Sequence, residues 1–171
     1  MRNQRSAVSP SISLRALSPS KGCQLSAGTE VRAITLHQPW ATLMAKGLKK
    51  IETRSWYTAY RGLLVIHAAA YIEKYDLGYI KADLKYRLRL ELEDLPTRCM
   101  LGICELSDCE MILLDNSPAR PEYDYGNYKP GRYMWKTKNM CELRQPIPAR
   151  GYQRLWRPTE EQLVAIREQL G

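Results

Sequence analysis

The sequence predicts an α+β domain built on a mixed, partly closed β-sheet that is flanked by short helices. Several stretches alternate apolar and polar residues with the two-residue period of a β-strand. Helical patterns lie between these stretches, and some of the connections are long and rich in Gly and Pro. Strands, interspersed helices and long connections in one chain are together typical of this fold class.

The first half of the domain is predicted to contain three strands and one short helix. Pro39 suits the first position of a helix, which is expected over 40–46 and to end at Gly47. An aromatic loop follows the second strand, and the third strand is strongly apolar. The three strands are expected over residues 31–36, 49–55 and 63–69.

The second half begins with a helical pattern over 72–95, which is interrupted near Gly78 and ended by Pro96. Residues 115–131 have the composition of a loop and contain three tyrosines. Three further strands are expected over 100–114, 132–143 and 151–156. The run Thr159-Glu160-Glu161-Gln162 is a capping box, which predicts a closing helix.

The composition favours a partner that is both aromatic and negatively charged. The chain has 171 residues, enough for one domain with a substantial core. It contains 11 Tyr and 4 Trp but no Phe, so its aromatic side chains also offer polar edges for hydrogen bonding. Its net charge is +8 and its pI is about 9.3, which favours polyanionic partners.

Residues 1–29 are predicted to form a disordered, basic, Ser-rich tail before a domain over residues 30–171. The tail contains seven Ser and no acid, and it supplies four of the eight net positive charges. Such a segment buries too little apolar surface to offset its chain entropy. The expected location is the cytoplasm. An organellar transit peptide and an upstream start codon are alternative explanations for the tail.

Neither a metal site, a cofactor nor a membrane span is predicted. The five Cys are an odd number in a chain with no apolar secretory segment, so reduced thiols are expected. Cys99, Cys104 and Cys109 are evenly spaced but lack the Cys-x2-Cys pairing of zinc sites. The acids of the segment Glu105–Asp108–Glu110 alternate with apolar residues, which favours an ordinary strand surface over a divalent-ion site. No run approaches the 18 apolar residues that a membrane span needs.

The stretch 47–56 is the most informative part of the chain. If it is a strand, Lys50, Glu52 and Arg54 share one face, because alternate residues point the same way. One interpretation is a solvated face with cross-strand ion pairs. The other is an anion or nucleotide site in which Glu52 holds Lys and Arg side chains in place.

This stretch resembles the signature of the ASCH domain family, Gly-x-Lys-x-x-Glu-x-Arg. The chain matches all four fixed positions, as Gly47, Lys49, Glu52 and Arg54. The resemblance extends over roughly residues 31–157. Its other matches, in order, are Thr35-Leu36-His37-Gln38-Pro39-Trp40-Ala41, Ser55-Trp56-Tyr57, Tyr60-Arg61-Gly62, His67-Ala68, Leu101-Gly102, Pro130-Gly131-Arg132-Tyr133-x-Trp135 and Pro146-Ile147-Pro148-x-x-Gly151.

The resemblance implies a PUA-like small mixed β-barrel whose signature strand lines a cleft for single-stranded RNA or another nucleic acid. Lys49 and Arg54 would meet phosphate or base edges, and Glu52 would accept from an amine or orient Arg54. A cleft shared by all three requires Lys49 to lie on the turn before the strand, or a bulge. The implied nucleic-acid-binding residues are Gln38, Trp40, Lys49, Glu52, Arg54, Ser55, Trp56, Tyr57, Arg61 and His67.

Several of these residues also have a purely structural interpretation. Trp40, at the start of a short helix, is equally suited to the core and to stacking on a base. Arg61 can cap the aromatic loop instead of binding phosphate. His67 lies in an apolar strand, where histidine commonly forms hydrogen bonds within the core.

Two enzymatic branches also resemble this chain, and in either case Lys49 and Glu52 would be catalytic. Amidohydrolases that act on acetylated cytidine use Lys-x-x-Thr, but this chain has Glu52 at the position of that Thr, so modified nucleosides are an alternative ligand. Ribonucleases that act on single-stranded RNA need an acid–base pair, which Lys49, Glu52 and His67 could supply. A non-catalytic module that binds single-stranded RNA is the preferred function.

Overall fold

The computed structural model describes residues 25–26, 28–74 and 77–171. The prediction of a disordered tail over residues 1–29 therefore falls mostly outside the described residues. Among the tail residues that are described, Leu25 packs against one of the apolar clusters of the domain.

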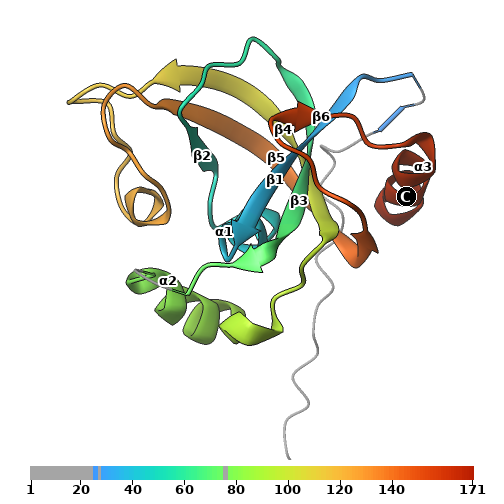
Figure 1. Cartoon of the computed structure of the whole chain (residues 1–171), viewed down its shortest axis with the longest axis horizontal. Helices are drawn as coiled ribbons and strands as arrows, with labels where there is room; N and C mark the ends of the chain where they lie inside the picture. The colour runs from blue at the N-terminus through green and yellow to red at the C-terminus, as the bar shows by residue number, and fades with distance from the viewer. Residues whose placement is uncertain (1–24, 27, 75–76) are drawn as a thin grey trace, which may run out of the picture.

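A single six-stranded sheet forms the centre of the molecule and curls strongly (Figure 1). Its strands are β1 (Val31–Gln38), β2 (Ile51–Arg54), β3 (Gly62–Ile72), β4 (Cys99–Met111), β5 (Tyr133–Pro148) and β6 (Leu155–Trp156). They lie in the order β2-β5-β4-β3-β1-β6, and only β1 and β3 run parallel. The mixed α+β class is confirmed, but the sheet is open between the edge strands β2 and β6 and is not a closed barrel.

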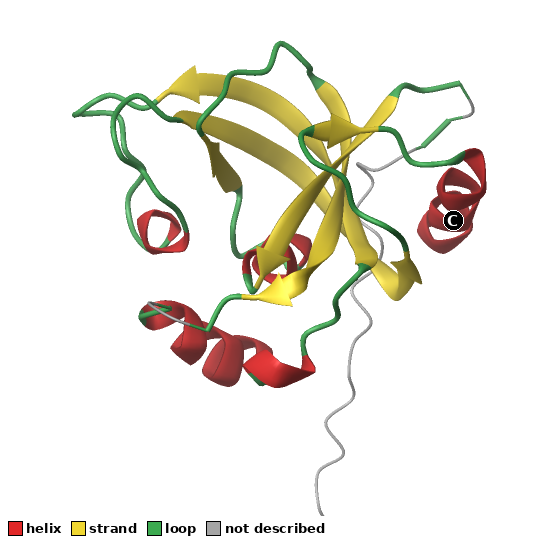
Figure 2. Ribbon diagram, in the orientation of Figure 1, coloured by secondary structure: helices red, strands yellow, loops and turns green. Residues whose placement is uncertain are grey.

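Short helical segments surround the sheet (Figure 2). They are α1 (Trp40–Ala45), α2 (Tyr79–Ala82), the π-helix η1 (Asp83–Leu88), the 3₁₀ helices η2 (Leu92–Asp94) and η3 (Glu122–Tyr125), and α3 (Glu160–Leu170). The helical region predicted over 72–95 is shorter; the predicted interruption near Gly78 is present, and a second one occurs at Arg89. Gly78 has a φ of 43° before α2 and Arg89 has a φ of 56° after η1, so left-handed backbone interrupts the helix.

Both faces of the central strands are covered, which explains the continuous apolar sequence of β3. Leu64 and Ile66 pack against α1 and Trp135, whereas Val65 points to the other face and joins a cluster with Ile166 of α3. Helices α1 and α3 therefore lie on opposite faces of the sheet. The site described below is on the edge next to α1.

Two predicted strand boundaries differ from the structure at places that matter for the site. Strand β2 begins at Ile51 and not at residue 49, because Lys49 still belongs to the turn after α1. The strand predicted over 151–156 is reduced to Leu155 and Trp156, and residues 149–154 form a loop instead.

We expect Thr159→Ala to lower the free energy of unfolding by about 1 kcal/mol. The Thr159 hydroxyl accepts from the backbone N–H of Gln162 at 3.3 Å, and the Gln162 side chain accepts from the Thr159 N–H at 2.9 Å. Urea denaturation measures the loss. Thr159→Ser is the control, because it keeps the hydroxyl and should retain nearly all of the stability; an equal loss in both variants would contradict a role for the cap.

Candidate functional site

A cleft of about 360 Å³ lies between the end of β1, the start of α1, strand β2 and the loop around η3. Its polar lining comes from Thr35 of β1, Lys49 of the turn after α1, and Glu52 and Arg54 of β2. Trp40 of α1 contributes an aromatic wall. The opposite side is made by the η3 loop, chiefly by Tyr125 and Asn127.

The turn after α1 determines where Lys49 lies. Gly47 has a φ of 70°, a left-handed conformation that glycine adopts without steric cost and that ends the helix. The backbone N–H groups of Leu48 and Lys49 then both donate to the carbonyl of Leu43, each at 3.0 Å. The chain therefore turns back against α1, and the Lys49 side chain points toward the floor of the cleft.

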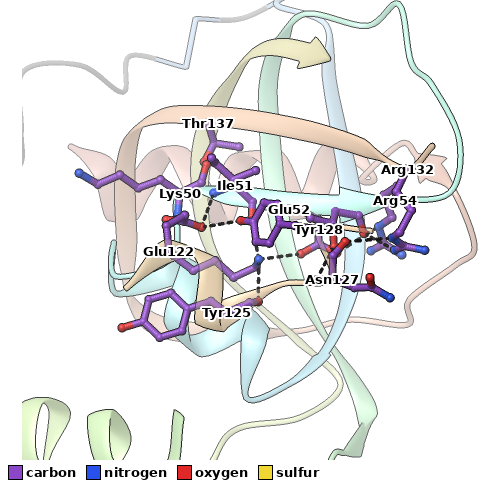
Figure 3. A network of polar contacts seen from close by, with 12 residues as sticks. Lys50, Ile51, Glu52, Arg54, Glu122, Tyr125, Asn127, Tyr128, Arg132 and Thr137 are labelled. Carbon is purple, nitrogen blue, oxygen red and sulfur yellow. Dashed lines mark hydrogen bonds and ion pairs between the residues drawn. The ribbon is translucent and has the colours of Figure 1, made fainter. Parts of the chain in front are cut away.

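Glu122 connects the η3 loop to the start of β2. Its two carboxylate oxygens accept from the backbone N–H groups of Lys50 and Ile51, at 2.8 and 3.0 Å (Figure 3). Hydrogen bonds that a carboxylate accepts are among the stronger ones in proteins. This clamp fixes the residues that directly follow Lys49.

Lys49 is almost fully buried, with 1% of its side chain exposed. Its ammonium group donates to the backbone carbonyls of Ile51 and Tyr125, the latter at 3.0 Å, and lies 3.5 Å from Oε2 of Glu52. Three protein oxygens therefore surround the Nζ atom. Lys49 is placed to position its neighbours, and it has little capacity left to contact a phosphate directly.

Glu52 joins Lys49 to Arg54. Its Oε1 atom lies 3.3 Å from Nε of Arg54, and its side chain is 14% exposed in the cleft. Arg54 also donates from Nη2 to the backbone carbonyl of Thr35 at 3.0 Å. The guanidinium is thus held on two sides, which pre-organises the donors that remain.

The structure answers how Lys49 can share a cleft with Glu52 and Arg54. Lys49 precedes β2, so strand alternation does not govern the direction of its side chain. This is the arrangement that the sequence required for a shared cleft. Thr53 also borders the cleft, beside the η3 loop, and its hydroxyl accepts from the N–H of Asn127 at 3.2 Å.

The loop that contains η3 is attached to β2 by Arg132, a residue that the sequence did not assign to the site. Arg132 donates to the backbone carbonyls of Thr53 and Asn127, both at 3.1 Å, and ties the loop to β2 (Figure 3). The Tyr125 ring is buried, and its hydroxyl donates to Asp83 at 2.5 Å. Burial, together with this bond to Asp83, raises the pKa of Tyr125 to about 12, so its hydroxyl stays protonated.

The predicted aromatic residues divide between the cleft and its surroundings. Trp40 packs against the apolar cluster around Leu43 and also lines the cleft, so both of its interpretations apply. Trp56 packs edge-on against Trp135, at 4.6 Å between ring centroids, and borders a neighbouring hollow. Tyr57 is 54% exposed but lies outside the cleft.

Three other predicted residues lie outside the cleft. Gln38 is buried: its side-chain amide donates to the Pro96 carbonyl at 2.6 Å, and its carbonyl accepts from the Thr42 N–H at 3.0 Å. Arg61 donates to the carbonyls of residues 58 and 60 and so caps the aromatic loop. Ser55 is exposed on the bend after β2.

His67 is also separate from the Lys49–Glu52–Arg54 group. It is 1% exposed and borders a second hollow, where its Nε2 atom lies 3.0 Å from the Ala149 carbonyl. Because a carbonyl only accepts, Nε2 carries the proton, and the buried Nδ1 atom has no hydrogen-bond partner. Burial lowers the pKa of His67 below its usual value, although the bond to Ala149 opposes this effect.

The described residues contain no group of three or more His, Cys, Asp or Glu side chains that could hold a metal ion. The acids of β4 each pair with a different base: Glu105 with Lys138, Asp108 with Arg61, and Glu110 with Lys136. Burial raises the pKa of the Cys104 thiol to about 12, so it is unreactive near neutral pH. In the described part of the chain, no helix is long and apolar enough to cross a membrane.

Comparison with known proteins identifies the class of domain. The model of the ASCH domain family matches residues 34–145, and this chain belongs to that family. ASCH domains have a PUA-like fold and are associated with RNA binding.

Particular relatives are similar over most of the chain. It is 30% identical over 129 residues to activating signal cointegrator 1 of Homo sapiens and 29% identical to that of Mus musculus. Each alignment covers 72% of this chain but only 22% of the relative, so the chain spans about a fifth of their length. The crystal structure of ASCH from Zymomonas mobilis matches with a TM-score of 0.50 at 14% identity, over 79% of this chain and 93% of that one.

We expect Lys49→Met to lower the free energy of unfolding by about 3 kcal/mol, because it removes the buried one of the two cations that pair with the largely buried Glu52 carboxylate. The substitution also removes the donors to the carbonyls of Ile51 and Tyr125. Lys50→Met is the matched control, since Lys50 is exposed, and its effect should stay within about 0.5 kcal/mol. Equal effects in urea denaturation would mean that the buried pair does not stabilise the fold.

Stability should also fall as the pH drops below about 6.5, the usual pKa of histidine. With a lowered pKa in the folded state, His67 binds its proton more readily in the unfolded chain, so acid favours unfolding. The measurement is the free energy of unfolding at about pH 7.5 and about pH 5.5. His67→Gln should reduce the difference, whereas His37→Gln, which leaves His67 in place, should keep it. If the free energy of unfolding of His67→Gln changed between the two pH values as much as that of wild type, His67 would not be the cause.

Proposed function

We propose that this chain binds single-stranded RNA and that one nucleotide base enters the cleft beside Arg54. The observation that carries the proposal is the chain of contacts from buried Lys49 through Glu52 to Arg54, which holds a planar guanidinium at a fixed place. A fixed guanidinium offers paired donors that suit a base edge or a phosphate.

The charge of the cleft favours a base over a phosphate as its occupant. Two cations, Lys49 and Arg54, are matched there by two carboxylates, Glu52 and Asp124. A site with balanced charge, an aromatic wall at Trp40 and several polar groups fits a neutral heterocycle better than a dianion. The volume of about 360 Å³ is within the usual range for small-molecule pockets.

The shape of the site supports a single-stranded ligand. Bases inside a duplex are stacked, and an unstacked base can enter a concave cleft more easily. Sequence-specific RNA recognition commonly uses such bases, which stack on aromatic rings and hydrogen-bond along their edges. Trp40 and the carboxylate of Glu52 provide these two kinds of contact here.

The contacts do not favour the two hydrolytic alternatives. This chain has Glu52 where the amidohydrolases have their Thr, and the hydroxyl of the adjacent Thr53 already accepts a hydrogen bond from the Asn127 N–H. His67, the expected acid–base partner of Lys49 and Glu52 in a ribonuclease, borders a different hollow. A binding module therefore requires fewer changes to the observed contacts.

The full chain, titrated with labelled single-stranded RNA, tests this proposal. Arg54→Met should weaken binding by about tenfold or more, because a well-placed arginine contact contributes about 1–3 kcal/mol. Arg61→Met is the matched control: it removes the same charge from an arginine that caps the aromatic loop outside the cleft, so affinity should change little.

RNA length should be followed in the same samples. The proposal is supported if the RNA stays intact, binds to wild type and binds much more weakly to Arg54→Met. Equal binding by both would show that the cleft is not the site. Shortened RNA with wild type but not with Glu52→Gln would make the protein a nuclease and overturn the non-catalytic function.

A further inference from the structure

Two further hollows continue from the cleft along β1. The first, of about 520 Å³, is bordered by Arg54, Trp56 and the loop 151–154; the second, of about 530 Å³, is bordered by His67, Arg98 and Arg150. Thr35 borders the cleft and both hollows, and Gly151 borders both hollows. The three therefore adjoin one another. We call the two hollows together the arginine groove.

The arginine groove has a different charge from the cleft. Its lining contains Arg54, Arg98, Arg150 and Arg154 and not one acid among the described residues. The cleft beside it, in contrast, has as many carboxylates as cations. A run of unbalanced positive charge next to a neutral cleft matches the charge pattern of a nucleotide chain, in which bases are neutral and each linking phosphate is negative.

Three of the four groove arginines also differ from most others in the domain, because they lack acidic partners. Arg98, Arg150 and Arg154 are exposed, and none forms an ion pair with a described carboxylate. The arginines that do form ion pairs are Arg32, Arg54, Arg61, Arg87, Arg120, Arg157 and Arg167. The groove thus retains three guanidinium groups that are free to bind an external anion.

The loop 149–154 is held firmly against the sheet. The Ala149 N–H donates to the Arg98 carbonyl at 2.9 Å, and the Ala149 carbonyl accepts from His67. Gly151 lies so close that an added Cβ would be 2.5 Å from the His67 ring and 2.7 Å from the Thr35 hydroxyl. These contacts fix the backbone from which Arg150 and Arg154 extend.

Two of the groove arginines occupy backbone conformations that disfavour their side chains. Arg98 has a φ of 54° and Arg154 a φ of 58°, in the left-handed region where glycine and asparagine are preferred. Residues in such conformations cluster at functional sites. Arginine at these positions is costly for the backbone, so its side chain is expected to contribute something other than stability.

Aromatic rings lie beside the arginines of the loop. The guanidinium of Arg150 lies 5.6 Å from the centre of the Tyr152 ring, and that of Arg154 lies 5.7 Å from the centre of the Trp56 ring. Tyr152 is 53% exposed. Positive charges interleaved with aromatic faces are the usual means of binding a single strand without regard to its sequence.

We propose that the arginine groove binds the phosphodiester backbone of the RNA strand whose base occupies the cleft, with Arg98, Arg150 and Arg154 contacting successive phosphates. The inference rests on the proposed function and extends it from one nucleotide to a strand of several. It assigns base recognition to the cleft and most of the electrostatic affinity to the groove.

The test uses the full chain and a single-stranded RNA of about twelve nucleotides, with affinity measured over a range of salt concentrations. The triple variant Arg98→Asn/Arg150→Asn/Arg154→Asn should bind at least about tenfold more weakly at low salt. Each lost phosphate contact on a single strand lowers the steepness of the logarithmic salt dependence by about 0.7, so the slope should fall by about 2. Asparagine tolerates left-handed backbone, so the variant should unfold at the same temperature as wild type or higher.

Arg89→Asn is the control, because Arg89 is another exposed arginine with left-handed backbone, at a φ of 56°, that borders neither the cleft nor the groove. It should leave the salt slope unchanged. If wild type binds and depends on Arg54 but the triple variant behaves like Arg89→Asn, the groove inference alone fails. If wild type binds no RNA, both the groove inference and the proposed function fail.

Discussion

The buried contact of Lys49 with Glu52 is the interaction on which the site depends. A lysine that is 1% exposed must have its charge compensated, and Glu52 and two backbone carbonyls do this from three directions. The same carboxylate then holds Arg54, which in turn bonds to β1. Three segments that are distant in sequence, namely residues 49–54, the η3 loop and β1, are thus joined through Lys49, Glu52 and Arg54.

The sequence predicted much of the fold and the centre of the site because these features depend on local residue types. Alternation located the strands, Gly47 ended α1, and the capping box at Thr159 is present as expected. The spacing of Lys49, Glu52 and Arg54 correctly indicated that they lie together. Whether the sheet closes into a barrel was not predictable, because this depends on whether the distant strands β2 and β6 pair, and they do not.

Other parts of the site depend on contacts that no sequence pattern predicts. The bond from Lys49 to Tyr125 spans 76 positions and ends on a backbone carbonyl, which every residue type possesses. Glu122 likewise holds backbone N–H groups, so no complementary side chain marks its role. Arg98 and Arg154 adopt left-handed backbone without being glycine or asparagine, so the usual signal for such turns is missing.

The prevalence of side-chain to main-chain bonds has a consequence for how the site can diversify. Lys49, Arg54, Glu122 and Arg132 all bond to backbone atoms of another segment. A main-chain partner is unaffected when its own side chain is exchanged. Substitutions in the η3 loop can therefore change the side chains that line the cleft without removing the bonds that attach the loop to β2. The ligand preference of the site can change in evolution while the fold around it stays the same.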